Sequence, residues 1–265
     1  MTTHDPARLR HLLDHPLIGE RYFVPRAAVM DDATIVTSGP HRLGCYLEQP
    51  QTGDDALTIV HWHGNGEIVP DYRPDIANLF LSLGVNLMLA EYRGYGASSS
   101  DPALVGMFDD IAPIMAATGA PPERVIVFGR SIGSIYAIEC ARQFPTIAGL
   151  VLESGIADPL ERVLLRVEPA ELDCTHDEIE AAAAMFVDHR AKLAAYRGPL
   201  LVMHAVHDML IDISHARRNH EWAGSAQKQL KEFTVGGHND IQARNLDSYF
   251  ATLDRFIQSV RPAGR

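Results

Sequence analysis

Short apolar runs alternate with segments of helical periodicity along most of the chain, and this alternation restricts the fold more than any other feature. The apolar runs predict strands at residues 57–63, 85–92, 124–129, 150–154, 199–205 and 229–235. Segments with apolar residues at helical spacing lie between and after them, at residues 71–83, 101–117, 131–144, 213–223 and 240–260. Buried strands in alternation with helices predict an α/β fold, with a mainly parallel central sheet and helices on both of its faces.

The remaining segments fit a single domain. A helix is expected at residues 5–15, and two antiparallel strands are expected at 33–37 and 42–47 around the turn sequence SGPH. The chain has 265 residues, which is an ordinary size for one α/β domain. We therefore predict one domain over residues 1–265.

Residues 155–198 form a less regular stretch between two predicted strands. Two amphipathic helices are expected here, at 157–167 and 176–196, with apolar stripes of Leu160, Val163, Leu164, Val167, Ile179, Ala183, Phe186 and Val187. Two interpretations are open. The helices either cover the sheet, or they form a short helical cap whose apolar side chains line an acyl pocket.

The charge balance argues against several classes of partner. Asp and Glu number 34 against 23 Lys and Arg, a net charge of −11, which disfavours nucleic acid and anionic lipid surfaces. It also favours neutral substrates over highly anionic ones. No stretch approaches the ~18 apolar residues of a membrane span, and no secretory signal is evident. Three scattered cysteines without a C-x-x-C pair fit a cytoplasmic protein. The sequence gives no indication of oligomeric state.

The sequence Gly129-Arg130-Ser131-Ile132-Gly133 lies between a predicted strand and a predicted helix. In that context Gly-x-Ser-x-Gly is typical of a nucleophile elbow, a tight turn that raises the serine hydroxyl above the sheet. The flanking Gly129 and Gly133 allow the backbone to turn tightly. The alternative is that Ser131 only caps the helix. The strand–turn–helix context favours Ser131 as a nucleophile.

A serine nucleophile needs a base, and the loop after the last predicted strand offers His238 in the sequence GGHND. The alternative is that His238 is a solvated loop residue. A carboxylate should orient the imidazole, and Asp208 and Asp212 both follow the strand at 199–205. We favour Asp208, because Asp212 precedes a helix, where an N-cap role would explain it.

The sequence HGNGE follows the first of the predicted buried strands. Acyl transfer needs hydrogen-bond donors at the developing oxyanion, and we expect the backbone amides of Asn65 and Ile132 to be these donors. Gly64 lets the backbone approach the substrate closely. His61 and His63 offer an alternative as metal ligands, but two histidines without a third ligand are a weak signal. No metal is predicted.

Five motifs together resemble those of α/β-hydrolase-fold serine hydrolases: HGNGE, EYRGYGAS, GRSIGS, HAVHD and GGHND. The nearest resemblance is to the α/β-hydrolase-domain-containing proteins that include the palmitoyl-protein depalmitoylases, and it covers most of the chain. It implies the α/β-hydrolase fold, with Ser131 as nucleophile, His238 as base and Asp208 as acid, in the chain order of that fold. Arg130 departs from the pattern, since relatives often have Gln or His there.

The motifs and the resemblance predict an enzyme that cleaves carboxylic ester or thioester bonds of a small-molecule substrate, through an acyl-enzyme and without a cofactor. Two alternatives stay open. The same residues could hydrolyse an amide or peptide bond, or a non-catalytic protein could bind a ligand on a hydrolase scaffold.

Overall fold

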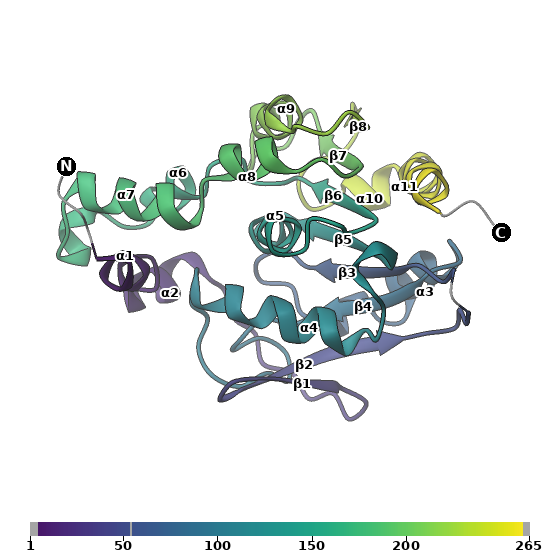
Figure 1. Ribbon diagram of the computed structural model, residues 1–265, viewed down its shortest axis with the longest axis horizontal. Coiled ribbons are helices and arrows are strands. Elements are labelled where there is room, and N and C mark those ends of the chain that lie inside the picture. Colours follow the sequence, from purple (N-terminus) through teal and green to yellow (C-terminus); the bar gives the residue numbers. More distant parts are fainter. Residues whose placement is uncertain (1–4, 54, 262–265) are drawn as a thin grey trace.

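The structure is a computed structural model that describes residues 5–53 and 55–261. An eight-stranded sheet forms the centre of this part of the chain (Figure 1). The strand order is β1-β2-β4-β3-β5-β6-β7-β8. β2 pairs antiparallel with β1 and β4, and the other pairs are parallel. The strands are β1 (Thr34–Ser38), β2 (His41–Glu48), β3 (Thr58–Trp62), β4 (Asn86–Ala90), β5 (Val125–Arg130), β6 (Gly149–Glu153), β7 (Leu200–Ala205) and β8 (Lys228–Phe233).

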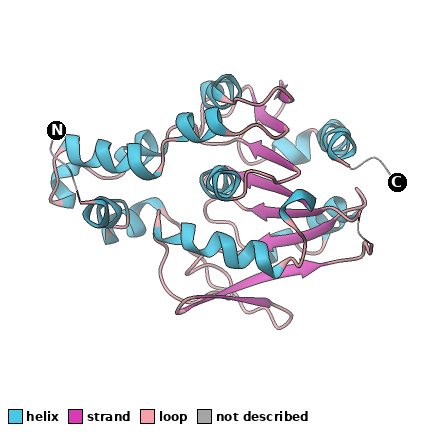
Figure 2. Cartoon of the chain, in the orientation of Figure 1, coloured by secondary structure: helices cyan, strands magenta, loops and turns pink. Residues whose placement is uncertain are grey.

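Helices lie on both sides of the strands (Figure 2). The α-helices are α1 (Pro6–Leu13), α2 (Pro16–Tyr22), α3 (Asp75–Leu81), α4 (Ile111–Ala117), α5 (Gly133–Gln143), α6 (Pro159–Leu164), α7 (His176–Phe186), α8 (His189–Ala195), α9 (Ile213–Trp222), α10 (Ile241–Arg244) and α11 (Leu246–Val260). Short 3-10 helices are η1 (Val69–Tyr72), η2 (Gly106–Asp110), η3 (Pro122–Arg124) and η4 (Pro169–Leu172). The predicted α/β fold with a mainly parallel sheet is confirmed. None of the described helices is both long and apolar enough to cross a membrane.

Side chains of the parallel strands alternate between two cores, one on each face of the sheet. In β5, Val125 and Val127 belong to the core that α4, α5 and α9 cover. Ile126 and Phe128 belong to the core that α3 and α11 cover. Successive residues of a strand point to opposite faces, so a strand buried on both faces is apolar throughout. This explains the continuous apolar runs in the sequence.

Some predicted helices differ from the observed ones. The helix expected at 101–117 is a 3-10 turn, η2, followed by the short α4. The helix expected at 176–196 is divided into α7 and α8, because Asp188 starts a new helix by accepting a hydrogen bond from the Ala191 amide. α2 was not predicted at all. It begins at Pro16, which is favourable at a first helical position, directly after the end of α1.

The N-terminal helices lie beside the segment 155–198, far from them in sequence. Figure 1 shows α1 and α2 next to α6 and α7 at one end of the molecule. Two ion pairs join these segments: Arg8 to Glu178 and Arg21 to Glu171, each at 2.9 Å. The helices α1 and α2 and the segment 155–198 therefore form one side of the molecule together.

Candidate active site

Ser131 lies in a strained turn between β5 and α5. Its φ is 52°, in the left-handed region that residues other than glycine rarely adopt. Its backbone amide donates to the Glu153 carbonyl, at the end of the neighbouring strand β6, at 2.8 Å. The turn places Ser131 directly before the N-terminus of α5, where backbone N–H groups favour a negatively charged oxygen. This is the strand–turn–helix geometry of a nucleophile elbow.

We expect Gly133→Ala to lower the free energy of unfolding by about 1–3 kcal/mol or more, as overpacking of a tight contact does. A Cβ at position 133 would lie 2.1 Å from the Trp62 carbonyl oxygen in β3, so the backbone must shift. Denaturant unfolding measures the loss. The control is Gly237→Ala, where the nearest atom to the added Cβ is 3.6 Å away. Equal losses in the two variants would contradict the contact as the cause.

The structure brings Ser131, His238 and Asp208 into one hydrogen-bonded chain. His238 Nε2 lies 2.9 Å from Ser131 Oγ, and His238 Nδ1 lies 2.7 Å from Asp208 Oδ2. The three residues follow the carboxyl ends of β5, β8 and β7, at the edge of the sheet where α/β proteins place their chemistry. They are 7%, 8% and 5% exposed, respectively. The order and spacing suit a nucleophile, a base and an orienting carboxylate.

Asp208, and not Asp212, contacts the imidazole. Asp208 Oδ1 also accepts hydrogen bonds from the amides of Leu210 and Ile211, at 2.9 and 2.8 Å. Burial raises the pKa of the Asp208 carboxyl, but the hydrogen bond and charge of His238, with these two amides, outweigh it, so the pKa lies below the usual value. Asp212 instead caps the N-terminus of α9.

The loop after β3 brings Asn65 to the same place. Its side chain is held at both ends: Oδ1 accepts from the Tyr95 hydroxyl at 2.7 Å, and Nδ2 donates to the Tyr22 carbonyl at 2.6 Å. Among the described residues the backbone amides of Asn65 and Ile132 have no acceptor, and both residues line the pocket that contains Ser131. These amides are thus available as donors to a bound oxygen.

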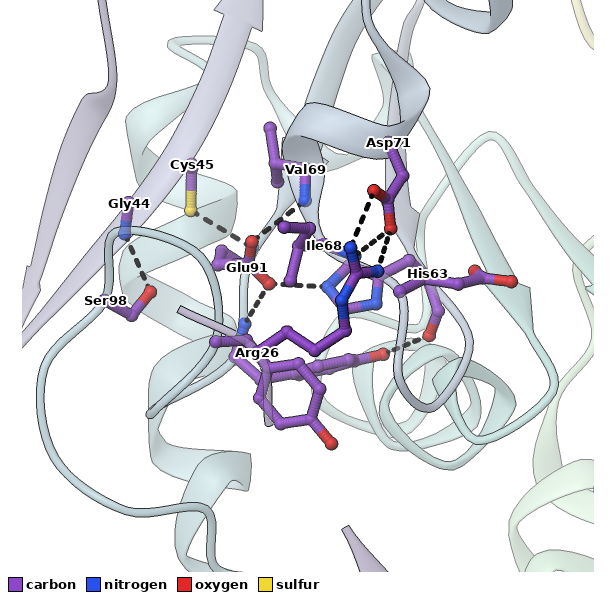
Figure 3. Close-up of polar contacts among 12 residues, drawn as sticks. Arg26, Gly44, Cys45, His63, Ile68, Val69, Asp71, Glu91 and Ser98 are labelled. Atoms are coloured by element: carbon purple, nitrogen blue, oxygen red, sulfur yellow. Dashed lines mark hydrogen bonds and ion pairs between the residues drawn. The ribbon is translucent and has the colours of Figure 1, made fainter. Parts of the chain in front are cut away.

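His61 and His63, the alternative metal ligands, have different surroundings. His63 Nε2 lies 2.6 Å from Glu91 Oε1, and Glu91 Oε2 accepts from the Val69 amide at 2.9 Å (Figure 3). Burial lowers the pKa of His63, but the Glu91 carboxylate outweighs it and raises the pKa overall. His61 stacks on Phe128, with ring centroids 4.7 Å apart. The described residues contain no group of three or more His, Cys, Asp or Glu side chains suited to a metal.

Arg130 connects the elbow to the histidine loop. Its Nη2 donates to the His238 carbonyl at 2.9 Å, and its Nη1 and Nε lie 2.7 and 3.2 Å from carboxylate oxygens of Glu67 and Glu153. Burial lowers the pKa of Arg130, but the two carboxylates outweigh it and raise the pKa. No role for Arg130, Glu67 or Glu153 was predicted from the sequence. One sequence feature could have indicated a role: Glu153 is a charged residue at the end of a buried strand.

A pocket of about 240 Å³ contains Ser131 in its lining. Its lining residues are Tyr22, Asn65, Arg130, Ser131, Ile132, Ile156, Arg162, Arg166, Leu210, Ile211, His238 and Asn239. None of the apolar stripe residues predicted in the segment 155–198 lines this pocket. Val163 in α6, Val167 just after it and Ile179 in α7 are buried in the core instead. The polar side chains Arg162 and Arg166 line the pocket instead.

Alpha/beta hydrolase domain-containing proteins are similar to this chain in sequence. Alpha/beta hydrolase domain-containing protein 17C from mouse is 26% identical over 231 residues, covering 85% of this chain and 67% of the relative. Its human counterpart is also 26% identical over 231 residues, covering 85% of this chain and 65% of the relative. The chain thus spans about two thirds of the length of these relatives. No protein-family model matches the chain.

Solved structures with the same fold include several esterases. The esterase Pf2001 from Pyrococcus furiosus matches with a TM-score of 0.68 at 15% identity, over 89% of this chain and 98% of its own. Est1E from Butyrivibrio proteoclasticus, with ferulic acid bound, has a TM-score of 0.69 at 16% identity, over 86% and 98%. Mouse alpha/beta hydrolase domain-containing protein 10 matches with a TM-score of 0.68 at 14% identity, over 86% of this chain and 99% of its own. The fold is the α/β-hydrolase fold.

Proposed function

From the α/β-hydrolase fold we propose that this protein is a serine hydrolase that cleaves carboxylic ester or thioester bonds through an acyl-enzyme. The hydrogen-bonded chain of Ser131, His238 and Asp208 carries the proposal. The esterases among the structural neighbours support a small-molecule ester as substrate. The hydrolase names of the sequence relatives agree with it.

In the proposed acylation step Ser131 Oγ attacks the carbonyl carbon while its proton passes to His238 Nε2. Asp208 holds the imidazole with Nδ1 protonated and stabilises the imidazolium. The amides of Asn65 and Ile132 bind the negative oxygen of the tetrahedral intermediate. When the bond from carbon to the leaving oxygen or sulfur breaks, His238 returns the proton to the leaving group. The acyl group stays on Ser131.

In the proposed deacylation step a water molecule takes the place of the leaving group. His238 Nε2 accepts a proton from the water as its oxygen attacks the acyl carbon. The bond to Ser131 Oγ then breaks, and the proton returns to the serine. The carboxylic acid leaves, and the protein regains its starting state.

We expect short acyl chains to be preferred. The pocket of about 240 Å³ is below the ~300–1,000 Å³ usual for ligand sites, and much of its lining is polar. A series of p-nitrophenyl esters from acetate to palmitate tests this, with kcat/KM expected to fall as the chain lengthens. The highest kcat/KM for palmitate would contradict it.

Activity should fall as the pH is lowered from 8 to 5. The pKa of Asp208 is lowered, so its carboxylate stays ionised over this range and does not account for the loss; a general base acts only in its unprotonated form. The measurement is kcat/KM for a neutral ester, with circular dichroism at each pH to show that the protein stays folded. A flat profile over this range would argue against His238 as the base.

A further inference from the structure

The pocket that contains Ser131 has a positive lining in an acidic protein. Asp and Glu outnumber Lys and Arg by 34 to 23 along the chain. The described residues that line the pocket nevertheless include Arg130, Arg162 and Arg166, and no aspartate or glutamate. Arg130 is paired with the partly exposed Glu67 and the buried Glu153. The unmatched positive charge therefore belongs to Arg162 and Arg166, in the segment that starts after β6.

Arg162 and Arg166 differ from other arginines near them. Within residues 5–53 and 55–261, neither guanidinium group makes an ion pair or a hydrogen bond. Arg218, by contrast, pairs with Glu161 at 3.2 Å, so the carboxylate next to Arg162 in sequence is already occupied. Like charges that share a pocket repel each other until an anion neutralises them. Guanidinium groups also match the planar fork of a carboxylate.

Tyr22 adds a third donor to the same pocket. It is 9% exposed, and its hydroxyl is buried without a hydrogen-bond partner among the described residues. Burial raises the pKa of Tyr22, and the nearby charges of Arg162 and Arg166 offset this only in part, so the hydroxyl stays protonated and can donate. Two guanidinium groups and one hydroxyl thus form a set of donors that has no acceptor in the described part of the chain.

We propose that Arg162, Arg166 and Tyr22 bind a carboxylate group that is part of the substrate, while Ser131 attacks the ester or thioester carbonyl. The inference rests on the proposed function and names its substrate class: small anionic esters or thioesters. The pocket of about 240 Å³ places the carboxylate only a short distance from the scissile bond. An anionic substrate is the opposite of what the net charge of the chain suggested, because positive charge gathers at this pocket although the whole chain is acidic.

Two matched pairs of substrates test the inference. Monoethyl adipate and ethyl hexanoate differ by a carboxylate on the acyl side, whereas 4-acetoxybenzoate and 4-acetoxybenzamide differ by one on the leaving-group side. We expect kcat/KM to favour the anionic member of one pair by about tenfold or more, as hydrogen bonds to charged groups do. The pair that responds shows on which side of the scissile bond the carboxylate lies. The preference should weaken as sodium chloride is added.

Single variants assign the preference to the two arginines. Arg162→Gln and Arg166→Gln should each lower the anionic-to-neutral ratio of kcat/KM by about tenfold. Arg190→Gln is the matched control, because Arg190 is an exposed arginine in the same segment that does not line this pocket. Its ratio should equal that of the unmodified protein. A ratio near one for both pairs in the unmodified protein, or the same loss in the control, would overturn the inference.

A binding measurement without catalysis tests the carboxylate site independently of the proposed ester hydrolysis. 4-Hydroxybenzoate should raise the melting temperature more than 4-hydroxybenzamide does, and the Arg162→Gln/Arg166→Gln double variant should lose that difference. No such difference in the unmodified protein, together with an anionic-to-neutral ratio of kcat/KM near one in both substrate pairs, would overturn the carboxylate site even if neutral esters are cleaved. A difference without any ester cleavage or fluorophosphonate labelling would retain the carboxylate site but contradict its link to ester hydrolysis.

Discussion

Ser131→Ala should abolish covalent labelling by a fluorophosphonate and lower kcat for a neutral ester by about 10⁶-fold, as loss of the nucleophile does in subtilisin. The hydroxyl of Ser131 is held 2.9 Å from His238, the proposed base, in a turn whose strain fixes its direction. Alanine keeps the turn and removes only the attacking oxygen. Gel-based labelling and ester turnover measure the two effects on the same preparation.

Ser154→Ala is a close control for this experiment. Ser154 is also buried with a left-handed φ, 47°, and its hydroxyl has no partner among the described residues. It follows β6 and is not hydrogen-bonded to His238. Labelling and turnover should match those of the unmodified protein. Labelling that persists in Ser131→Ala would show that another residue is the nucleophile.

Asp208→Asn should lower kcat by about 10⁴-fold while the protein stays folded. The carboxylate accepts a hydrogen bond from His238 Nδ1 at 2.7 Å, which leaves Nε2 free to accept the serine proton. Asparagine has nearly the same shape, but its amide NH₂ can donate to Nδ1 and favour the wrong tautomer. It also cannot stabilise the imidazolium. Steady-state kinetics with a neutral ester, beside a thermal melt, measure the effect.

The control for Asp208→Asn is Asp212→Asn, four positions along the same loop. Asp212 caps α9 by accepting from the Ser214 amide at 2.9 Å, and asparagine is a comparable N-cap. We expect kcat within a factor of about three and a change in stability below about 1 kcal/mol. Similar large losses of kcat in both variants would show that neither carboxylate acts specifically on the imidazole.

The hydrophobic pattern predicted the parallel strands well, because a strand buried on both faces must be apolar along its whole length. β5 and β7 fall close to the predicted runs at 124–129 and 199–205. Helices were predicted less well, since capping and turns interrupt helical periodicity. Asp188 starts a new helix inside the segment expected to be continuous.

The proximity of the candidate site residues was predictable for a related reason. Ser131, Asp208 and His238 follow β5, β7 and β8, and the carboxyl ends of parallel strands all meet at one edge of the sheet. Local sequence therefore sufficed to expect their proximity. The ion pairs of Arg130 were not predictable in this way, because Glu67 reaches it from the loop after β3 and Glu153 from the end of β6.

The sequence by itself determined the α/β class, the mainly parallel sheet and the positions of Ser131, Asp208 and His238 at strand ends. Local patterns suffice there, because periodicity and strand direction determine where a strand-end residue lies. Only the tertiary structure decided the character of the pocket. Tyr22, Arg162 and Arg166 meet because α2 packs beside the segment after β6, and the apolar face of that segment turns into the core. Such long-range packing depends on how distant surfaces fit together, which no local pattern specifies.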